Sequence, residues 1–132
     1  MVDVPGIDDE HRLLAESCCD LERALTGGAP AARFESIYQE LVQRSAKHFS
    51  HEEREMRAGG YALYAWHRRQ HVAARAKITA LGGCLRCGDT DEARDLLQSL
   101  GQWLNDHIRL ADRMLGAYLR NRERARAAAV AV

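Results

Sequence analysis

The stretch "KHFSHEEREM", Lys47–Met56, places two histidines and three glutamates within ten residues. If it is helical, His48 and Glu52 share one face, because residues four apart lie one above the other on a helix. His51 and Glu55 form a second such pair, about 60° around the helix from the first, and we expect it to be an exposed or flanking ion pair. The stretch therefore predicts a histidine–carboxylate face that is either solvated or directed at a bound group.

Paired glycines divide the chain on either side of this stretch. Such pairs are poor in helix interiors and common at helix ends, and they occur at Gly27-Gly28, Gly59-Gly60 and Gly82-Gly83. No run alternates apolar and polar residues as a half-buried strand would. The segments between the glycines predict four helices, at about residues 8–26, 30–57, 61–81 and 89–125. Four helices with short connections predict an all-α, antiparallel up-down-up-down four-helix bundle.

The composition limits the possible classes of protein. The length of 132 residues is suited to a single domain, residues 1–132. Lys plus Arg and Asp plus Glu both number 19, so a nucleic-acid partner and an anionic membrane are not expected. No apolar run reaches the length of a membrane span, and the acidic start does not resemble a secretory signal. We expect a cytoplasmic protein that is a monomer or a weak oligomer.

Five of the six histidines fall at one level of the predicted bundle: His11, His48, His67, His71 and His107. His11 lies in line with the apolar stripe of the first helix, and His107 continues the stripe of the fourth. At about 1.5 Å rise per residue, all five lie in a slab about 10 Å thick. Four helices therefore direct imidazoles at a common depth.

A lone histidine in a helix is usually satisfied by its surroundings, but five at one level are not explained in that way. Buried polar groups need partners, and imidazoles with the carboxylate of Glu52 are typical metal ligands. Glu53 is about 140° from His48 and is expected on the solvent side. Asp112 follows His107 by five residues, again about 140° around the helix, so spacing alone does not select it as a ligand.

The four cysteines are expected to be thiols rather than a disulfide framework. Cys84 and Cys87 form a C-x-x-C pair, which we place in the loop after the third helix and consider as a redox switch. Cys18 lies on the His11 face and is expected in the core. A structural zinc site is not favoured, because only one pair has ligand spacing.

Four motifs resemble those of the hemerythrin family, and of bacterial hemerythrins in particular: "IDDEHRLL", "HFSHEEREM", "GYALYAWHRRQH" and "WLNDHIRLAD". The pattern H…HxxxE…HxxxH…HxxxxD occurs in full and in order, one motif for each predicted helix, over residues 7–118. The resemblance implies two iron ions bridged by an oxo or hydroxo group. The ligands it implies are His11 and His48 for one iron, His67, His71 and His107 for the other, and Glu52 and Asp112 as bridges.

Some features depart from the family pattern. Only ten residues precede His11, and Ala62 stands where the family often has a proline. His51 and the four cysteines are additional.

The resemblance implies a protein that reversibly binds dioxygen, for carriage, storage or delivery to a protein partner. In the implied ligand set, the iron held by His11 and His48 has one coordination place left open. Five neutral imidazoles against two carboxylates favour binding over oxidation, and Leu14, Trp103 and Ile108 are candidates for an apolar pocket around the dioxygen. Two alternatives remain open: an enzyme that consumes peroxide or nitric oxide, and a sensor of dioxygen or redox state.

Overall fold

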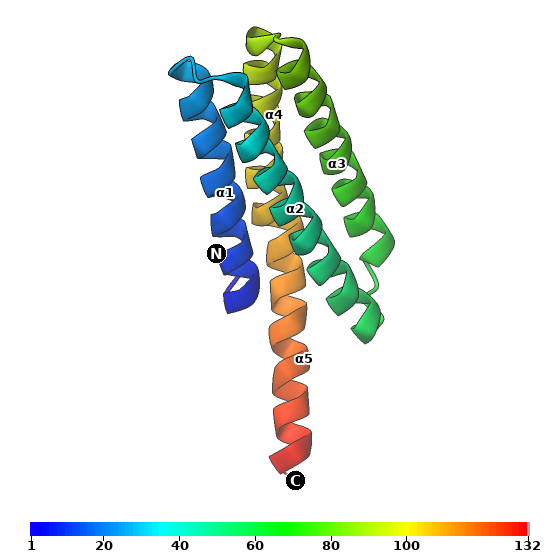
Figure 1. The fold of residues 1–132 in the computed structure, drawn as a ribbon. Coiled ribbons are helices and arrows are strands. Elements are labelled where there is room, and N and C mark those ends of the chain that lie inside the picture. Colours follow the sequence, from blue (N-terminus) through cyan, green and yellow to red (C-terminus); the bar gives the residue numbers. More distant parts are fainter. Residues whose placement is uncertain (132) are drawn as a thin grey trace.

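The structure is a computed structural model that describes residues 1–131. Within these residues the chain is helical apart from short connections, and it contains no strand. The elements are α1 (Pro5–Thr26), α2 (Ala31–Gly59), α3 (Tyr64–Cys87), α4 (Thr90–His107), the π-helical turn η1 (Ile108–Asp112) and α5 (Arg113–Ala131). Because α4, η1 and α5 form one continuous rod, four rods lie side by side in alternating directions (Figure 1). The predicted antiparallel four-helix bundle is confirmed.

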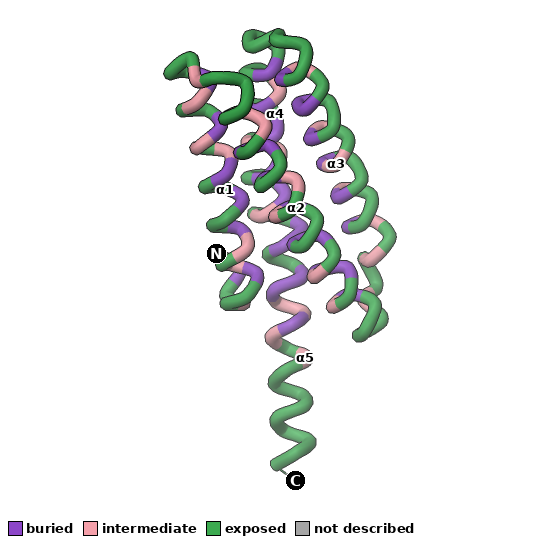
Figure 2. Tube along the Cα trace, viewed as in Figure 1, coloured by how far each residue is buried: buried purple, intermediate pink, exposed green. Residues whose placement is uncertain are grey.

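The four rods pack as a ring, in which α1 contacts α2, α2 contacts α3, α3 contacts α4, and α4 contacts α1. Their inward faces are buried, whereas the last part of α5 projects past the other helices and is exposed (Figure 2). Among the described residues, no helix combines the length and apolar character needed to cross a membrane.

The third helix extends beyond its expected end. The glycine pair Gly82-Gly83 lies inside α3, and the helix ends at Gly88, whose φ of 81° is a left-handed conformation that glycine adopts without strain. The expectation that Gly82-Gly83 breaks the chain was therefore wrong. Cys84 and Cys87 accordingly lie in the last turn of α3 and not in a loop.

The first helix begins at Pro5, earlier than the expected start near residue 8, and Pro5 lies in its first turn. Proline is suited to that position, since its missing N–H would have no helical partner there. The backbone N–H of Val2 donates to Asp8 Oδ1 at 2.8 Å, which holds the preceding residues against α1.

The apolar core is divided into two clusters by a polar layer. The larger cluster includes Leu14 and Leu104, and the smaller one includes Ile7, Met56 and Leu115. Along α1, α2 and the α4–α5 rod, the buried histidines and carboxylates lie between residues of these two clusters. Each of these three rods thus fixes its polar residues from both sides by apolar packing.

Replacing Gly82 with alanine is expected to destabilise the protein by about 1–3 kcal/mol, as overpacking of a core does. The added Cβ would collide with the ring of Tyr38, with Cε2 at 2.8 Å. That ring is fixed, because its hydroxyl donates to the carbonyl oxygen of Ile78 at 2.9 Å. Chemical denaturation of the metal-free variant measures the loss.

The adjacent Gly83 provides the matched control. A Cβ there meets nothing within 4 Å, so Gly83→Ala should stabilise α3 by about 0.5–1 kcal/mol. Equal effects at the two positions would contradict the role of Tyr38.

Candidate metal centre

Seven buried side chains converge in the polar layer and form two groups that share two members. In each group, one candidate ligand atom per residue lies within 4.8 Å of all the others. The first group consists of Glu52, His67, His71, His107 and Asp112, and the second of His11, His48, Glu52 and Asp112. The structure therefore brings together all seven residues that the resemblance implied, with the two carboxylates common to both groups.

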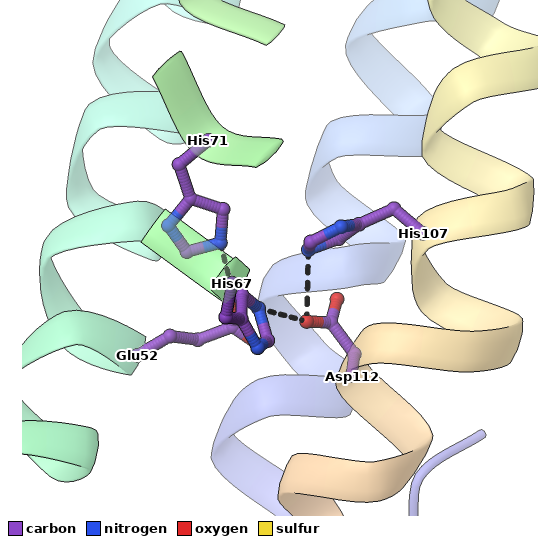
Figure 3. A group of neighbouring side chains, drawn as sticks. All are labelled: Glu52, His67, His71, His107 and Asp112. Atoms are coloured by element: carbon purple, nitrogen blue, oxygen red, sulfur yellow. Dashed lines mark hydrogen bonds and ion pairs between the residues drawn. The ribbon is translucent and has the colours of Figure 1, made fainter. Parts of the chain in front are cut away.

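Asp112 faces the two groups with different oxygens. Its Oδ1 lies 3.0 Å from His67 Nε2 and 3.0 Å from His107 Nε2 (Figure 3). Its Oδ2 lies 2.8 Å from His11 Nε2 and 4.0 Å from His48 Nε2. One carboxylate thus presents one oxygen to each side, as a bridge between two cations would.

Glu52 lies between the same two groups. Its Oε1 is 3.0 Å from His71 Nε2, 3.4 Å from His67 Nε2 and 3.5 Å from His48 Nε2. Its Oε2 is buried and has no hydrogen-bond partner among the described residues. Glu52 therefore presents two oxygens to the centre of the layer: Oε1 lies near imidazoles of both groups, and Oε2 has no partner among the described residues.

The donor atoms fit metal ions better than they fit one another. Inward atoms that lack a hydrogen-bond partner within residues 1–131 are His48 Nε2, His67 Nε2, His107 Nε2, Glu52 Oε2 and Asp112 Oδ1. Leaving so many buried polar atoms unpaired is costly, and a cation would pair all of them at once. Adjacent ligands about 2.1 Å from an octahedral ion lie about 3.0 Å apart. Six of the seven nitrogen–oxygen distances around the two carboxylates are 2.8–3.5 Å, and the seventh, from His48 Nε2 to Asp112 Oδ2, is 4.0 Å.

The π-helical turn η1 explains how Asp112 reaches the centre. In regular α-helix, a residue five positions after His107 would lie about 140° away. Backbone hydrogen bonding in η1 reaches back five residues, from the N–H of Arg113 to the carbonyl oxygen of Ile108. The turn holds one extra residue, so Asp112 returns to the face of His107.

Burial controls the protonation of the metal-free site. Burial lowers the pKa of His71 to about 2, and the neighbouring His67 and His107 add to the effect. The pKa of Glu52 is raised well above its usual value, first by burial and then by the charge of Asp112. For Asp112 burial also raises the pKa, but the imidazoles of His107, His11 and His67, whose Nε2 atoms lie 2.8–3.0 Å from its oxygens, outweigh it and hold the pKa well below its usual range. The metal-free site thus keeps His71 neutral, favours a proton on Glu52 and holds a negative charge on Asp112.

Three ligand candidates have acceptors on their outer nitrogen. The Nδ1 of His48 lies 2.8 Å from Glu10 Oε1, and that of His71 lies 3.0 Å from Glu53 Oε2. The Nδ1 of His107 lies 2.8 Å from the side-chain oxygen of Gln70. Each acceptor favours a proton on Nδ1, which leaves the Nε2 lone pair directed at the centre.

These outer acceptors were not found from the sequence, and one expectation was wrong. Glu53 was placed on the solvent side, but it is only 7% exposed because it lies between α2 and α3 against His71. Glu10 could have been noticed as the carboxylate directly before His11. Nothing in the spacing indicated Gln70.

The expected pair between His51 and Glu55 does not form. His51 Nδ1 lies 2.9 Å from Glu10 Oε1, so this histidine belongs to the surroundings of His48. Glu55 instead forms an ion pair with Arg122 of α5.

The three residues predicted to line an apolar pocket belong to the same larger apolar cluster, with Trp103 and Ile108 packed against its buried members. Leu14 is buried in the larger apolar cluster. Trp103 stacks on His107 with ring centroids 4.6 Å apart, next to the three-histidine group. Ile108 lines a groove of about 540 Å³ between α1 and α4, and His11 lines the same groove. Only Ile108 therefore shares an open space with a residue of the two-histidine group.

The cysteine pair lies far from this layer. Cys84 is thirteen residues after His71 on α3, which is about 20 Å of helix. Both thiols are free, and Cys87 Sγ donates to the carbonyl oxygen of Cys84. A redox role for Cys84 and Cys87 remains a prediction.

The family model described as "Hemerythrin HHE cation binding domain" matches residues 2–119. The bacteriohemerythrin of Stenotrophomonas maltophilia is 32% identical over 108 residues, covering 82% of this chain and 69% of the relative. The bacteriohemerythrin of Pseudomonas aeruginosa is 31% identical over 80% of this chain and 68% of its own length. The myohemerythrin of Sipunculus nudus is 27% identical over 80% and 77%, respectively.

No solved structure gives a significant match to the chain. The family match nevertheless covers all seven converging side chains, and the relatives share its name. The chain belongs to the hemerythrin family.

Proposed function

We propose that this protein holds two iron ions and binds dioxygen reversibly at one of them. The observation that carries the proposal is the unequal pair of ligand groups around two shared carboxylates. His67, His71 and His107 with the carboxylates provide five protein donors, whereas His11 and His48 with the same carboxylates provide four. The smaller set leaves more room for a ligand from outside.

When bound, a pair of ferrous ions would supply the electrons with which dioxygen is held. The chain's own residues favour a reversible reaction, because five neutral imidazoles stabilise the reduced metal more than additional carboxylates would. The two apolar clusters enclose the layer and limit the access of water and protons. His48, His67 and His71 are fully buried, and His11 is the most exposed of the seven at 8%. We therefore place the approach of the external ligand on the His11 side.

Metal analysis with an optical spectrum, recorded under air and then under argon, tests the proposal. The expected result is two irons per chain and a visible band that disappears under argon and returns in air. One zinc per chain, or no such band, would refute it. Turnover of hydrogen peroxide or nitric oxide by the iron-loaded protein would favour the enzyme, and a change of oligomeric state on oxidation would favour the sensor.

The groove between α1 and α4 is the proposed route to the two-histidine side. It is lined by His11, Ala15, Leu97, Gly101 and Ile108, among others. A small neutral molecule can follow this largely apolar wall. None of the other six converging residues lines it.

Replacing Gly101 with phenylalanine is expected to slow both binding and release of dioxygen. A Cβ at Gly101 meets nothing within 4 Å, so the larger side chain enters the groove without straining the helix. Obstruction of a route raises the barrier in both directions, so the equilibrium affinity should not change. Stopped-flow mixing and dissociation into an oxygen scavenger measure the two rates.

Gly83→Phe is the matched control, because Gly83 is also helical with open space beside it but lies away from the groove. It should leave both rates unchanged. Unaltered rates in Gly101→Phe would show that dioxygen enters by another route.

A further inference from the structure

Glu10 lies between two imidazoles on the outside of the two-histidine group. Its Oε1 lies 2.8 Å from His48 Nδ1 and 2.9 Å from His51 Nδ1, and its Oε2 lies 3.0 Å from His51 Nδ1. An ionised carboxylate only accepts hydrogen bonds, so both Nδ1 atoms donate. The three residues form a chain, His51–Glu10–His48, that joins α2 to α1.

The two histidines in this chain differ in exposure. The side chain of His48 is fully buried and directs Nε2 at the centre, whereas that of His51 is 29% exposed. The glutamate between them is 15% exposed. Without His51, one side of the Glu10 carboxylate would lose its protein donor, and the flexible side chain could turn toward solvent.

The N-terminal turn of α1 lies next to His51. A Cβ added at Gly6, which the glycine lacks, would lie 3.7 Å from His51 Cε1. His51 also lines a groove of about 530 Å³ beside this turn. The ring is therefore held to α1 by its hydrogen bond to Glu10 and is partly exposed to the groove.

We propose that His51 is a positioning residue for the two-histidine metal site: through Glu10 it holds His48 with its proton on Nδ1 and its Nε2 directed at the metal. The inference rests on the proposed metal pair but not on its reaction with dioxygen. Partners of this outer kind affect metal affinity because they fix the tautomer and the orientation of the ligand ring. His51 contacts no metal-directed atom itself, so its effect passes entirely through Glu10.

The three-histidine side has a corresponding arrangement built with arginine. Glu53 accepts from His71, and Arg75 donates to the same Oε2 at 3.1 Å. The chain His51–Glu10–His48 ends at the two-histidine group, and the chain Arg75–Glu53–His71 ends at the three-histidine group. A variant of either outer residue should therefore affect one metal and not the other.

The experiment uses the full chain loaded with Co(II), and follows metal release to a chelator by the cobalt absorption spectrum. For the wild type we expect two metals per chain, released in two phases. His51→Leu removes the donor but keeps the bulk, and should accelerate one phase by roughly 10–100-fold. Arg75→Leu should instead accelerate the other phase.

His51→Asn is the conservative variant, because its amide nitrogen takes nearly the place of Nδ1 and can still donate to Glu10. It should restore the wild-type release rate, which a purely packing role of the ring would not allow. Thermal unfolding of the metal-free proteins checks that all three variants fold alike. Wild-type release rates in His51→Leu, equal acceleration of both phases, or failure of asparagine to restore the rate would overturn the proposal.

The same measurements separate this inference from the proposed function. If the release pattern is as expected but iron-loaded protein shows no reversible band, the dioxygen proposal fails and the role of His51 stands. If the wild type binds fewer than two metals, both fail.

Discussion

Replacing Asp112 with alanine is expected to leave a folded protein that no longer holds two metal ions. Asp112 belongs to both ligand groups, with one oxygen directed at each. Its loss removes a donor from each side and the connection between them. Because the loss of an outer partner alone typically costs about 10–100-fold in metal affinity, the loss of a shared ligand should cost more than about 100-fold.

Isothermal titration with Fe(II) or Co(II) measures the effect, and circular dichroism checks the helix content. Asp106→Ala is the matched control, because Asp106 is an exposed carboxylate one residue before His107. It should bind two metals as the wild type does. Two tightly bound metals in Asp112→Ala would show that the carboxylate is not a bridge.

The sequence was informative where ligand spacing follows regular helix geometry. His48 and Glu52, and likewise His67 and His71, are four residues apart, and each pair converges on the centre as that spacing predicts. The common level of the histidines followed from the helix rise alone. These features are local, so the sequence displays them directly.

Asp112 shows where that reasoning ends. Helical periodicity placed it off the face of His107, and only the resemblance to hemerythrins indicated it. The structure resolves the difference with a single π-helical turn. Such a turn contains one residue more than a regular helical turn, so the residues after it face a different direction from the one that a period of 3.6 residues predicts. The packing that stabilises it involves other helices and is not visible in the local sequence.

Packing between helices was the other feature that the sequence did not predict. Gly82 was interpreted as a helix end, although its lack of a side chain makes room for Tyr38 of α2. Glu53 was interpreted as solvent-facing, although α3 covers it and places His71 against it. Both depend on the neighbour that a position faces, which a single helix does not reveal.

The metal-free protein is expected to lose stability on both sides of a pH optimum. On the acid side, the folded pKa of His71 is about 2, against an ordinary value of 6.5, and burial lowers the pKa of His48 in the same direction. The unfolded chain therefore binds more protons below pH 6.5, and stability falls as the pH decreases. Each proton contributes a slope of about 1.4 kcal/mol per pH unit.

Glu52 acts in the opposite direction. Burial raises its folded pKa above the ordinary 4.5, so the folded state binds the extra proton and stability falls as the pH rises above 4.5. Between pH 4.5 and 6.5 the glutamate partly offsets the histidines. Below pH 4.5 the histidines act without that opposition, and the lowered pKa of Asp112 adds to the loss as the pH passes its ordinary value of 3.8. Above pH 6.5 the two histidines no longer contribute to the slope, and the glutamate continues to lower stability as the pH rises. Above pH 9 the thiol of Cys18 acts in the same direction, because burial raises its pKa from 9.0 to about 11.

Bound metal should remove the alkaline decline, because a cation requires an ionised carboxylate and neutral imidazoles. The stability gained from metal should therefore increase with pH. Denaturant unfolding at a series of pH values, with chelator and with Co(II), measures both curves. Glu52→Gln is the diagnostic variant: between pH 6.5 and 9, below the range in which Cys18 titrates, it should abolish the alkaline slope of the metal-free protein while leaving the acid limb in place. A slope that persists between pH 6.5 and 9 in Glu52→Gln would assign the buried proton to another group.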